Sequence, residues 1–147
     1  MSKIEKYEDL KCWQQSRVLV NQVYEIIAVS KLKTEFALVD QLKRASISVM
    51  TNIAEGFSRY HRKDFIRFLD YAQSSAKEVK SLLYIVVDQK MTSQERVKEI
   101  QNNCDHCSAM ILALIKHLNK SLNNPNHTSE PKELYLTNEF IIHTSTR

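Results

Sequence analysis

The sequence predicts an all-α protein, an antiparallel up-down-up-down four-helix bundle with a short irregular C-terminal tail. Apolar residues make up 43% of the 147 residues, which is enough for the core of one domain. The chain contains one glycine and two prolines, and a β-rich fold would need many more turn residues. Apolar residues also recur at intervals of three and four along several long segments, as they do on one face of a helix.

The first expected helix spans about residues 9–29. Its apolar or small residues lie on one face, and Leu19 and Tyr24 support that face from adjacent positions. The face consists of Trp13, Ser16, Val20, Val23 and Ile27. The pattern breaks over residues 30–34, where Thr34 or a neighbour is expected to cap the second helix.

The second expected helix repeats this spacing and then reaches Gly56, the single glycine of the chain. Its stripe consists of Leu38, Leu42, Ala45, Val49 and Ile53. Glycine adopts the left-handed conformation found at helix ends without the steric cost of a Cβ atom. We therefore expect Gly56 to cap the C-terminus of this helix; the alternative is a glycine tolerated inside the helix.

Two further helices are expected before residue 122. The third begins near His61 or Arg62, and the fourth follows a capping box formed by Thr92 and Glu95. The stripe of the third consists of Phe65, Phe68, Leu69, Ala72, Ala76, Val79, Leu83 and Val86, and that of the fourth of Val97, Ile100, Cys104, Cys107, Ile111, Leu114 and Leu118. Short connections make neighbouring helices antiparallel, so residues 1–122 are expected to form one bundle domain.

Residues 123–147 are expected to form a C-terminal tail, because the helical period ends there. The segment contains both prolines among many Asn, Ser and Thr residues. Two short apolar runs, residues 134–136 and 140–142, stand out within it. We expect them to add a strand or to dock on a neighbouring subunit; the alternative is a disordered tail.

The composition predicts a soluble, cytoplasmic protein with reduced thiols. The first eleven residues mix lysines with acidic residues, unlike a signal peptide, and no apolar run approaches the roughly 20 residues of a membrane span. The three cysteines do not suggest a disulfide framework. Cys104 and Cys107 flank His106 in a C-x-H-C string, yet both fall on the buried stripe, and no second cluster supplies a fourth zinc ligand. We expect core packing, with no metal and no cofactor.

The net charge of +4 is concentrated in residues 43–67, which contain six basic and two acidic residues. Around the expected turn, Tyr60 and His61 place planar rings among the basic residues. Lys and Arg release counterions from phosphate backbones, and aromatic rings stack on unpaired bases. The alternative is a solvated face that only maintains solubility. The predicted nucleic-acid-binding residues are Lys43, Arg44, Arg59, Tyr60, Arg62, Lys63 and Arg67.

No pattern in the sequence predicts catalysis. It contains no glycine-rich phosphate loop, no H-E-x-x-H motif and no nucleophile elbow. Most carboxylates lie among basic partners on polar helix faces. The chain is therefore expected not to be an enzyme; the weaker alternative is an enzyme that uses the interior of the bundle as its pocket.

The second expected helix carries a resemblance to a known family. The stretch Gln41-Leu42-Lys43-Arg44-Ala45, then Ser48, then Asn52-Ile53-Ala54-Glu55-Gly56-Phe57, resembles the signature of the bacterial 23S rRNA-intervening-sequence family. The likeness covers about residues 7–122, through Asp9-Leu10-Lys11 with Trp13-Gln14 and through Phe65-Ile66-Arg67-Phe68-Leu69 with Ala72, Ser75 and Glu78. Met50 departs from the usual proline, His61 departs from the usual serine cap, and the tail has no counterpart.

The resemblance implies a four-helix bundle that assembles as a ring-like homopentamer. Such proteins are similar to the accessory proteins of diversity-generating retroelements, which are basic and engage nucleic acid and a reverse transcriptase. The leading expectation is therefore a homo-oligomer that binds RNA or single-stranded DNA through the basic window. The alternative is an interaction scaffold or an accessory subunit, for example of a reverse transcriptase or a ribonucleoprotein. No catalytic residues follow from the family, and no membrane partner is expected.

Asn52, Glu55 and Gly56 also have a structural interpretation that is independent of the family. Asn52 and Glu55 lie one turn apart beside the apolar stripe, just before the expected helix end. Both can bond the neighbouring backbone or pair with Arg44 or Arg59. We expect Asn52 and Glu55 to hold the corner between the second and third helices, in preference to binding a ligand.

Overall fold

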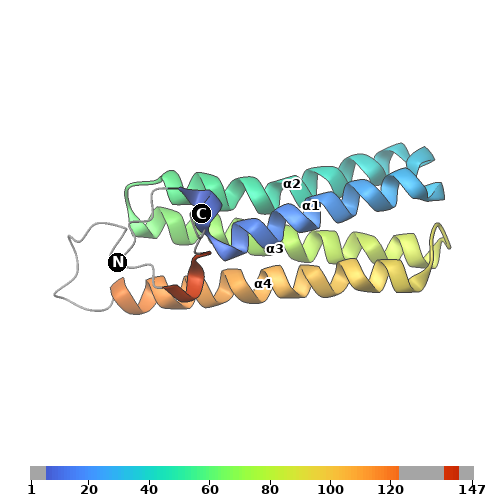
Figure 1. Ribbon diagram of the computed structural model, residues 1–147. Helices are drawn as coiled ribbons and strands as arrows, with labels where there is room; N and C mark the ends of the chain where they lie inside the picture. Colours follow the sequence, from blue (N-terminus) through green and yellow to red (C-terminus); the bar gives the residue numbers. More distant parts are fainter. Residues whose placement is uncertain (1–5, 123–137, 143–147) are drawn as a thin grey trace, which may run out of the picture.

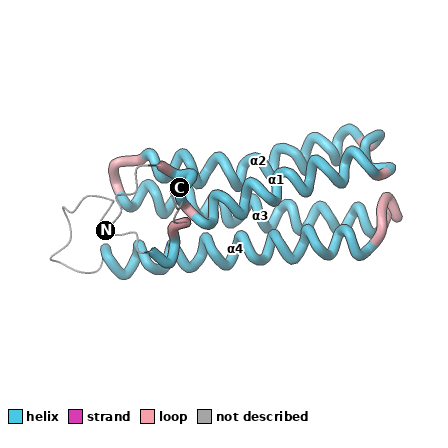
Figure 2. Tube along the Cα trace, in the orientation of Figure 1, coloured by secondary structure: helices cyan, strands magenta, loops and turns pink. Residues whose placement is uncertain are grey.

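Four long α-helices form the protein in the computed structural model, which describes residues 6–122 and 138–142 (Figure 1). They are α1 (Lys11–Val29), α2 (Phe36–Ser58), α3 (Arg62–Asp88) and α4 (Gln94–Leu122). Three short 3-10 turns accompany them: η1 (Tyr7–Asp9), η2 (Lys31–Thr34) and η4 (Asn138–Phe140). Figure 2 shows helix along almost all of the described chain and no strand in it. The predicted all-α bundle is confirmed.

Each helix runs back along the one before it in Figure 1. α1 packs against α2 and α4, and α3 packs against the same two helices. At one end of the bundle, the backbone N–H of Lys31 donates a hydrogen bond to the carbonyl of Met91 (3.3 Å), which joins the α1–α2 and α3–α4 connections. The other end holds the α2–α3 turn, the start of α1 and the end of α4. Within the described residues, no helix has both the length and the apolar character needed to cross a bilayer.

The core consists largely of the predicted stripes. Every predicted stripe residue of α4 is buried. On α1 the buried face is turned slightly from the predicted one, because Val20 is half-buried and Tyr24 is 45% exposed beneath Lys43 of α2. Leu38 and Phe68 are half-buried at the margin. The observed face of α1 consists of Cys12, Trp13, Ser16, Leu19, Val23, Ile26 and Ile27.

The prediction that Gly56 caps α2 is wrong. α2 continues to Ser58, and Arg59 follows it with an extended backbone. Gly56 is buried inside the helix without a positive φ. A Cβ atom there would lie 2.7 Å from the Cβ of Phe68, much closer than real Cβ contacts. Glycine is therefore required by the close approach of α3, and not by a helix end.

The predicted caps of two other helices are also displaced. α4 is capped by Ser93, one residue after the predicted Thr92, and the Ser93 hydroxyl accepts a hydrogen bond from the N–H of Arg96 (3.3 Å). At the start of α2, the neighbour Glu35 occupies the N-cap position without a side-chain cap bond, and the Thr34 hydroxyl donates to the carbonyl of Lys31 (3.1 Å). The start of α3 at Arg62 agrees with the prediction.

The apolar run 140–142 packs against its own bundle. Ile141 is buried and forms an isolated antiparallel bridge with Leu10, and the N–H of Ile142 donates to the carbonyl of Asp9 (2.7 Å). The predicted strand is therefore reduced to this single bridge. The other run, 134–136, and the rest of the predicted tail lie outside the described residues.

Candidate nucleic-acid interface

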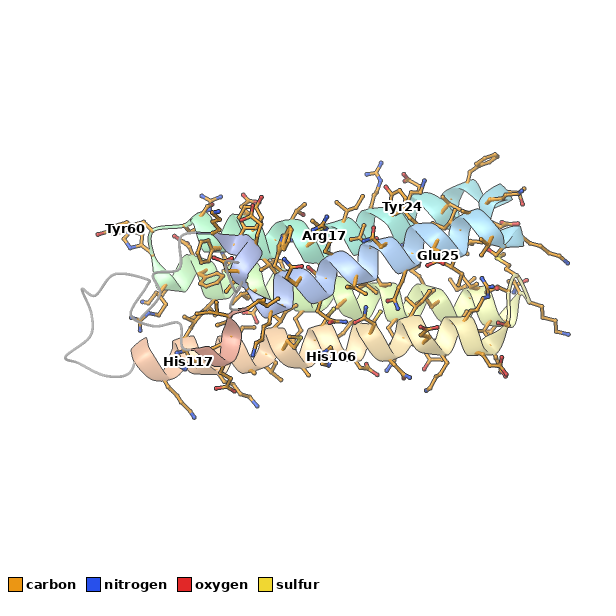
Figure 3. All side chains as sticks on the ribbon, viewed as in Figure 1. Arg17, Tyr24, Glu25, Tyr60, His106 and His117 are labelled. Carbon is orange, nitrogen blue, oxygen red and sulfur yellow. The ribbon has the colours of Figure 1, made fainter. Side chains whose placement is uncertain are left out.

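The turn between α2 and α3 exposes an aromatic ring. Tyr60 is 93% exposed, and its ring meets that of His61 edge to face at 5.1 Å. Figure 3 shows Tyr60 projecting past the ends of the helices. Only residues 59–61 lie between α2 and α3, and Arg59 and His61 both have extended backbones. This short, extended turn leaves the Tyr60 ring in solvent.

Two arginines beside this turn are held over one phenylalanine ring. The guanidinium of Arg59 lies 4.8 Å from the centre of the Phe68 ring, and that of Arg67 lies 5.6 Å from it. Arg59 also pairs with Glu55 (2.8 Å), and Arg67 pairs with Asp64 (3.2 Å). The Phe68 ring and the two carboxylates together limit the directions in which the guanidinium groups can point.

The ion pairs leave the turn electropositive. Both pairs are well exposed, so water screens them and they contribute little to stability. Arg62, which is half-buried, and Lys63, which is exposed, add two further positive charges at the first turn of α3. Five of the predicted binding residues are therefore gathered here: Arg59, Tyr60, Arg62, Lys63 and Arg67.

Lys43 and Arg44 are not part of this cluster. Arg59 follows Arg44 by fifteen positions, just past the end of α2, and this corresponds to about 22 Å along the helix axis. Lys43 lies 4.8 Å from the centre of the Tyr24 ring, and Arg44 pairs with Asp40 (2.9 Å). The predicted seven-residue site is thus divided into the turn and a separate position on the side of the bundle.

Other lysines, which the sequence window missed, reach the same end of the bundle. Lys116 and Lys120 lie in the last turns of α4, and Lys6 and Lys11 lie at the start of α1. We call this the cationic end and define it as residues 6–11, 55–67, 116–122 and 138–142. It contains eight Lys and Arg against five Asp and Glu, whereas residues 25–36 and 85–99 at the opposite end contain five of each. Applying the antiparallel topology to the charges would have found these lysines.

Asn52 and Glu55 bond neighbouring groups at the corner, whereas Gly56 contributes a close helix contact and not the expected cap. The side-chain amide of Asn52 donates to the carbonyl and to the hydroxyl of Ser48, both at 2.8 Å. That hydroxyl also bonds the hydroxyl of Ser75 on α3 (2.9 Å). Together with the Glu55–Arg59 pair and the tight contact at Gly56, this network fixes α2 against α3 just before the turn.

The cysteines belong to the core, as predicted for Cys104 and Cys107. Both are buried, as is Cys12, and His106 points away from them on the outside of α4 (Figure 3). Burial in apolar surroundings raises the pKa of each of the three thiols to about 12. In residues 6–122 and 138–142, no group of three potential ligands is placed to hold a metal ion.

Comparison with known proteins agrees with this architecture. Residues 8–113, more than half of the chain, match the model of the family described as 23S rRNA-intervening sequence protein. A crystal structure from Bacteroides thetaiotaomicron, of a protein with unknown function from the S23 ribosomal protein family, superposes with a TM-score of 0.65 at 22% identity. The similarity covers 71% of this chain and 98% of that one. No curated protein matches the sequence. The chain therefore belongs to the 23S rRNA-intervening sequence protein family.

Proposed function

We propose that this protein is a homo-oligomeric bundle that binds RNA or single-stranded DNA at its cationic end, without catalysing a reaction. The observation that carries the proposal is the uneven distribution of charge along the bundle. The cationic end has eight basic residues against five acidic ones, and the opposite end has equal numbers. A localised positive surface attracts phosphate backbones and gains free energy by releasing their counterions.

Tyr60 favours unpaired over paired nucleic acid as the ligand. Its ring is 93% exposed at the tip of the turn, within a cluster of cationic side chains. An exposed ring can stack on any unpaired base, whereas the bases of a duplex are already stacked on one another. The exposed ring supplies stacking, and the surrounding cations neutralise the backbone.

Self-association would strengthen this weak local surface. One cationic end offers few phosphate contacts, but several copies arranged side by side would bind one strand with avidity. The family resemblance to retroelement accessory proteins supports the same arrangement, with a homopentamer as the expected assembly. Static light scattering of the purified chain measures the number of copies directly. A monomer at micromolar concentration would contradict this part of the proposal.

A binding role is also supported by how the interior is filled. Leu42, Leu69 and Leu114 are fully buried in one continuous apolar core. The groove between α1 and α4 near Arg96 has a volume of about 310 Å³ and lies close to the surface. Its charged lining consists of Glu25, Glu99 and Arg96; all three are exposed, which is typical of a solvated surface and not of a substrate pocket.

Fluorescence polarisation with a labelled single-stranded RNA tests the proposed interface. The variant carries Arg59→Gln, Lys63→Gln and Arg67→Gln, and omits half-buried Arg62 to protect folding. The matched control carries Lys31→Gln, Lys33→Gln and Lys98→Gln at the opposite end, with the same loss of charge. We expect the first variant to bind about tenfold or more weakly and to lose roughly two units of salt slope. Equal affinities for the two variants would reject the cationic end as the interface.

A second candidate function is an accessory subunit or scaffold, for example for a reverse transcriptase or a ribonucleoprotein. Tyr71 and Ile85 are 50% and 44% exposed, and they are close to four helical turns apart, so they lie on one face of α3. The two side chains are about 21 Å apart along the helix, so they give two separate apolar contacts for a protein partner that lies along α3. Loss of a co-purified reverse transcriptase with Tyr71→Ser and Ile85→Ser, but not with the neutralised cationic end, would favour this function.

A further inference from the structure

Residues 138–142, which we call the arm, fill a groove between the start of α1 and the last turns of α4. The backbone of the arm joins that of η1 through the bridge between Ile141 and Leu10 and through the hydrogen bond from Ile142 to Asp9 (2.7 Å). The ring of Phe140 lies 5.0 Å from that of His117 on α4, close to η4 in Figure 3. The arm therefore bonds the backbone just before α1 and packs a side chain against α4.

One isolated bridge and one backbone hydrogen bond make the arm resemble the first contacts of a peptide that binds by strand addition. Backbone hydrogen bonds fix the direction of such a peptide, and pockets accept its side chains. Here the side chain of Ile141 is 5% exposed and covers Leu10, which is fully buried. A cavity of about 120 Å³ remains beside the arm; its lining consists of Lys11, Cys12, Met110, Ala113, Glu139 and Phe140. The groove thus binds a short apolar segment without being completely filled by it.

The described contacts of the arm do not require it to belong to the same chain. They join residues 138–142 to η1, α1 and α4. Fifteen residues, 123–137, connect the end of α4 to the arm, and a connection of that length spans at most about 50 Å. The path back from Leu122 to His117 is about 8 Å along the helix axis, and a four-helix bundle is about 20 Å wide. The connection is long enough to cross one bundle and reach a neighbour.

We propose that the groove is a docking site for the arm of a second copy of this chain, so that neighbouring protomers are joined by exchanged arms. The inference rests on the homo-oligomeric part of the proposed function. An arm makes the same contacts in either position, and exchange of an identical element is a low-cost route to assembly. The arm lies outside residues 8–113, which match the family model. In the exchanged position, the arm gives each protomer one more apolar contact with its neighbour.

Two single-cysteine variants test whether the arm crosses between chains. Lys11→Cys and Glu139→Cys place thiols on the two walls of the same cavity, one on α1 and one on the arm. Full-length chains carrying one change each are co-expressed and treated with a short bismaleimide. The three native thiols are buried with a pKa of about 12 and should react little near neutral pH.

The expected result is a covalent dimer whose linked peptide contains residue 11 of one chain and residue 139 of the other. Docking holds these thiols at a high effective concentration, so the yield should exceed that of the control by roughly tenfold or more. The control pairs Glu139→Cys with Lys33→Cys, an exposed lysine at the opposite end. Each variant is also treated alone to measure dimers formed by like chains.

The doubly substituted chain, Lys11→Cys with Glu139→Cys, decides between the two positions of the arm. Crosslinking confined to single chains, together with no crossed dimer in the co-expressed pair, would overturn arm exchange. Light scattering on the same samples separates the two proposals: an oligomer without crossed dimers rejects the exchanged arm alone, and a monomer rejects self-association as well. Nucleic acid is absent throughout, so failure of nucleic-acid binding leaves the result unaffected.

Discussion

Gly56 and Phe68 approach each other so closely that a Cβ atom on the glycine would lie 2.7 Å from the Cβ of the phenylalanine. The same Phe68 ring lies within cation–π distance of Arg59 and Arg67. The packing of α2 on α3 therefore determines the positions of the two guanidinium groups beside the turn. A change in the core contact at Gly56 would alter the candidate interface without touching a charged residue.

Gly56→Ala should destabilise the protein by up to about 2 kcal/mol. The new methyl group overlaps the Phe68 side chain, and overpacking of this kind costs about 1–3 kcal/mol. The better helix propensity of alanine offsets roughly 1 kcal/mol of that cost. Urea unfolding followed by circular dichroism measures the change.

Thr51→Ala, at an exposed position of the same helix, should stay within about 0.5 kcal/mol of the parent. Equal stability of the parent and Gly56→Ala would show that α3 can move away freely.

Asn103→Ala should weaken the seam between α1 and α4. The side-chain amide of Asn103 is buried there; its oxygen accepts a hydrogen bond from Gln15, and its nitrogen donates one to Gln22 (2.7 Å). Removing it leaves two glutamine groups partly buried without this partner, which costs about 1–3 kcal/mol. Urea unfolding of Asn102→Ala, an exposed neighbour, provides the baseline. If the two variants unfolded at the same urea concentration, water would have replaced the lost amide at no cost.

The buried thiols should make stability fall in alkaline solution. Their pKa is raised from 9.0 to about 12 in the folded protein, so between these values the unfolded chain loses protons that the folded chain keeps. The contribution is complete below pH 9 and is lost as the pH rises toward 12, at about 1.4 kcal/mol for each thiol and pH unit. Unfolding free energies at pH 8 and pH 10 measure the slope. Cys104→Ala should reduce that slope, whatever its effect on stability at pH 8; an unchanged slope would assign the pH dependence to other groups.

Tyr60→Ala should weaken binding of single-stranded RNA by about tenfold, because stacking of one base contributes about 1–3 kcal/mol. Tyr60→Phe keeps the ring and should bind like the parent. A duplex of the same sequence should bind both variants equally, since its bases are already stacked. Tyr84→Ala, at an exposed tyrosine of α3 outside the turn, is the matched control. If Tyr60→Ala lowered duplex and single-strand affinity alike, the ring would not be reading unpaired bases. Fluorescence polarisation at fixed salt measures all of these affinities.

The helices and most of the core were predictable because burial follows a simple period. The stripe from Val97 to Leu118 predicts the buried face of α4 residue by residue. On α1, Val20 and Tyr24 depart from the prediction because that face also borders α2, where Lys43 covers the tyrosine ring. Periodicity gives the direction of a face, whereas neighbouring helices decide where its margins lie.

The candidate site was less predictable, because it depends on contacts between segments. Glycine at a helix end and glycine at a close helix crossing look the same in one sequence, so Gly56 was assigned the wrong role. Arg44 and Arg59 share a charged window, yet about 22 Å of helix separates them. Lys120, far from that window in sequence, reaches the cationic end because α4 runs antiparallel to α3. Distance along the chain is a poor measure of distance across a bundle.

The bridge between Leu10 and Ile141 has a mechanical consequence. It joins the two extremes of the described chain at the same end of the bundle. In a chain whose own arm fills its groove, a pulling force applied at these two points would load that bridge first and then act on α1 and α4 from their ends. Peeling the helices from one end breaks few contacts at a time and needs little force. Pulling along the helix axes would load all of these contacts together and would need more force.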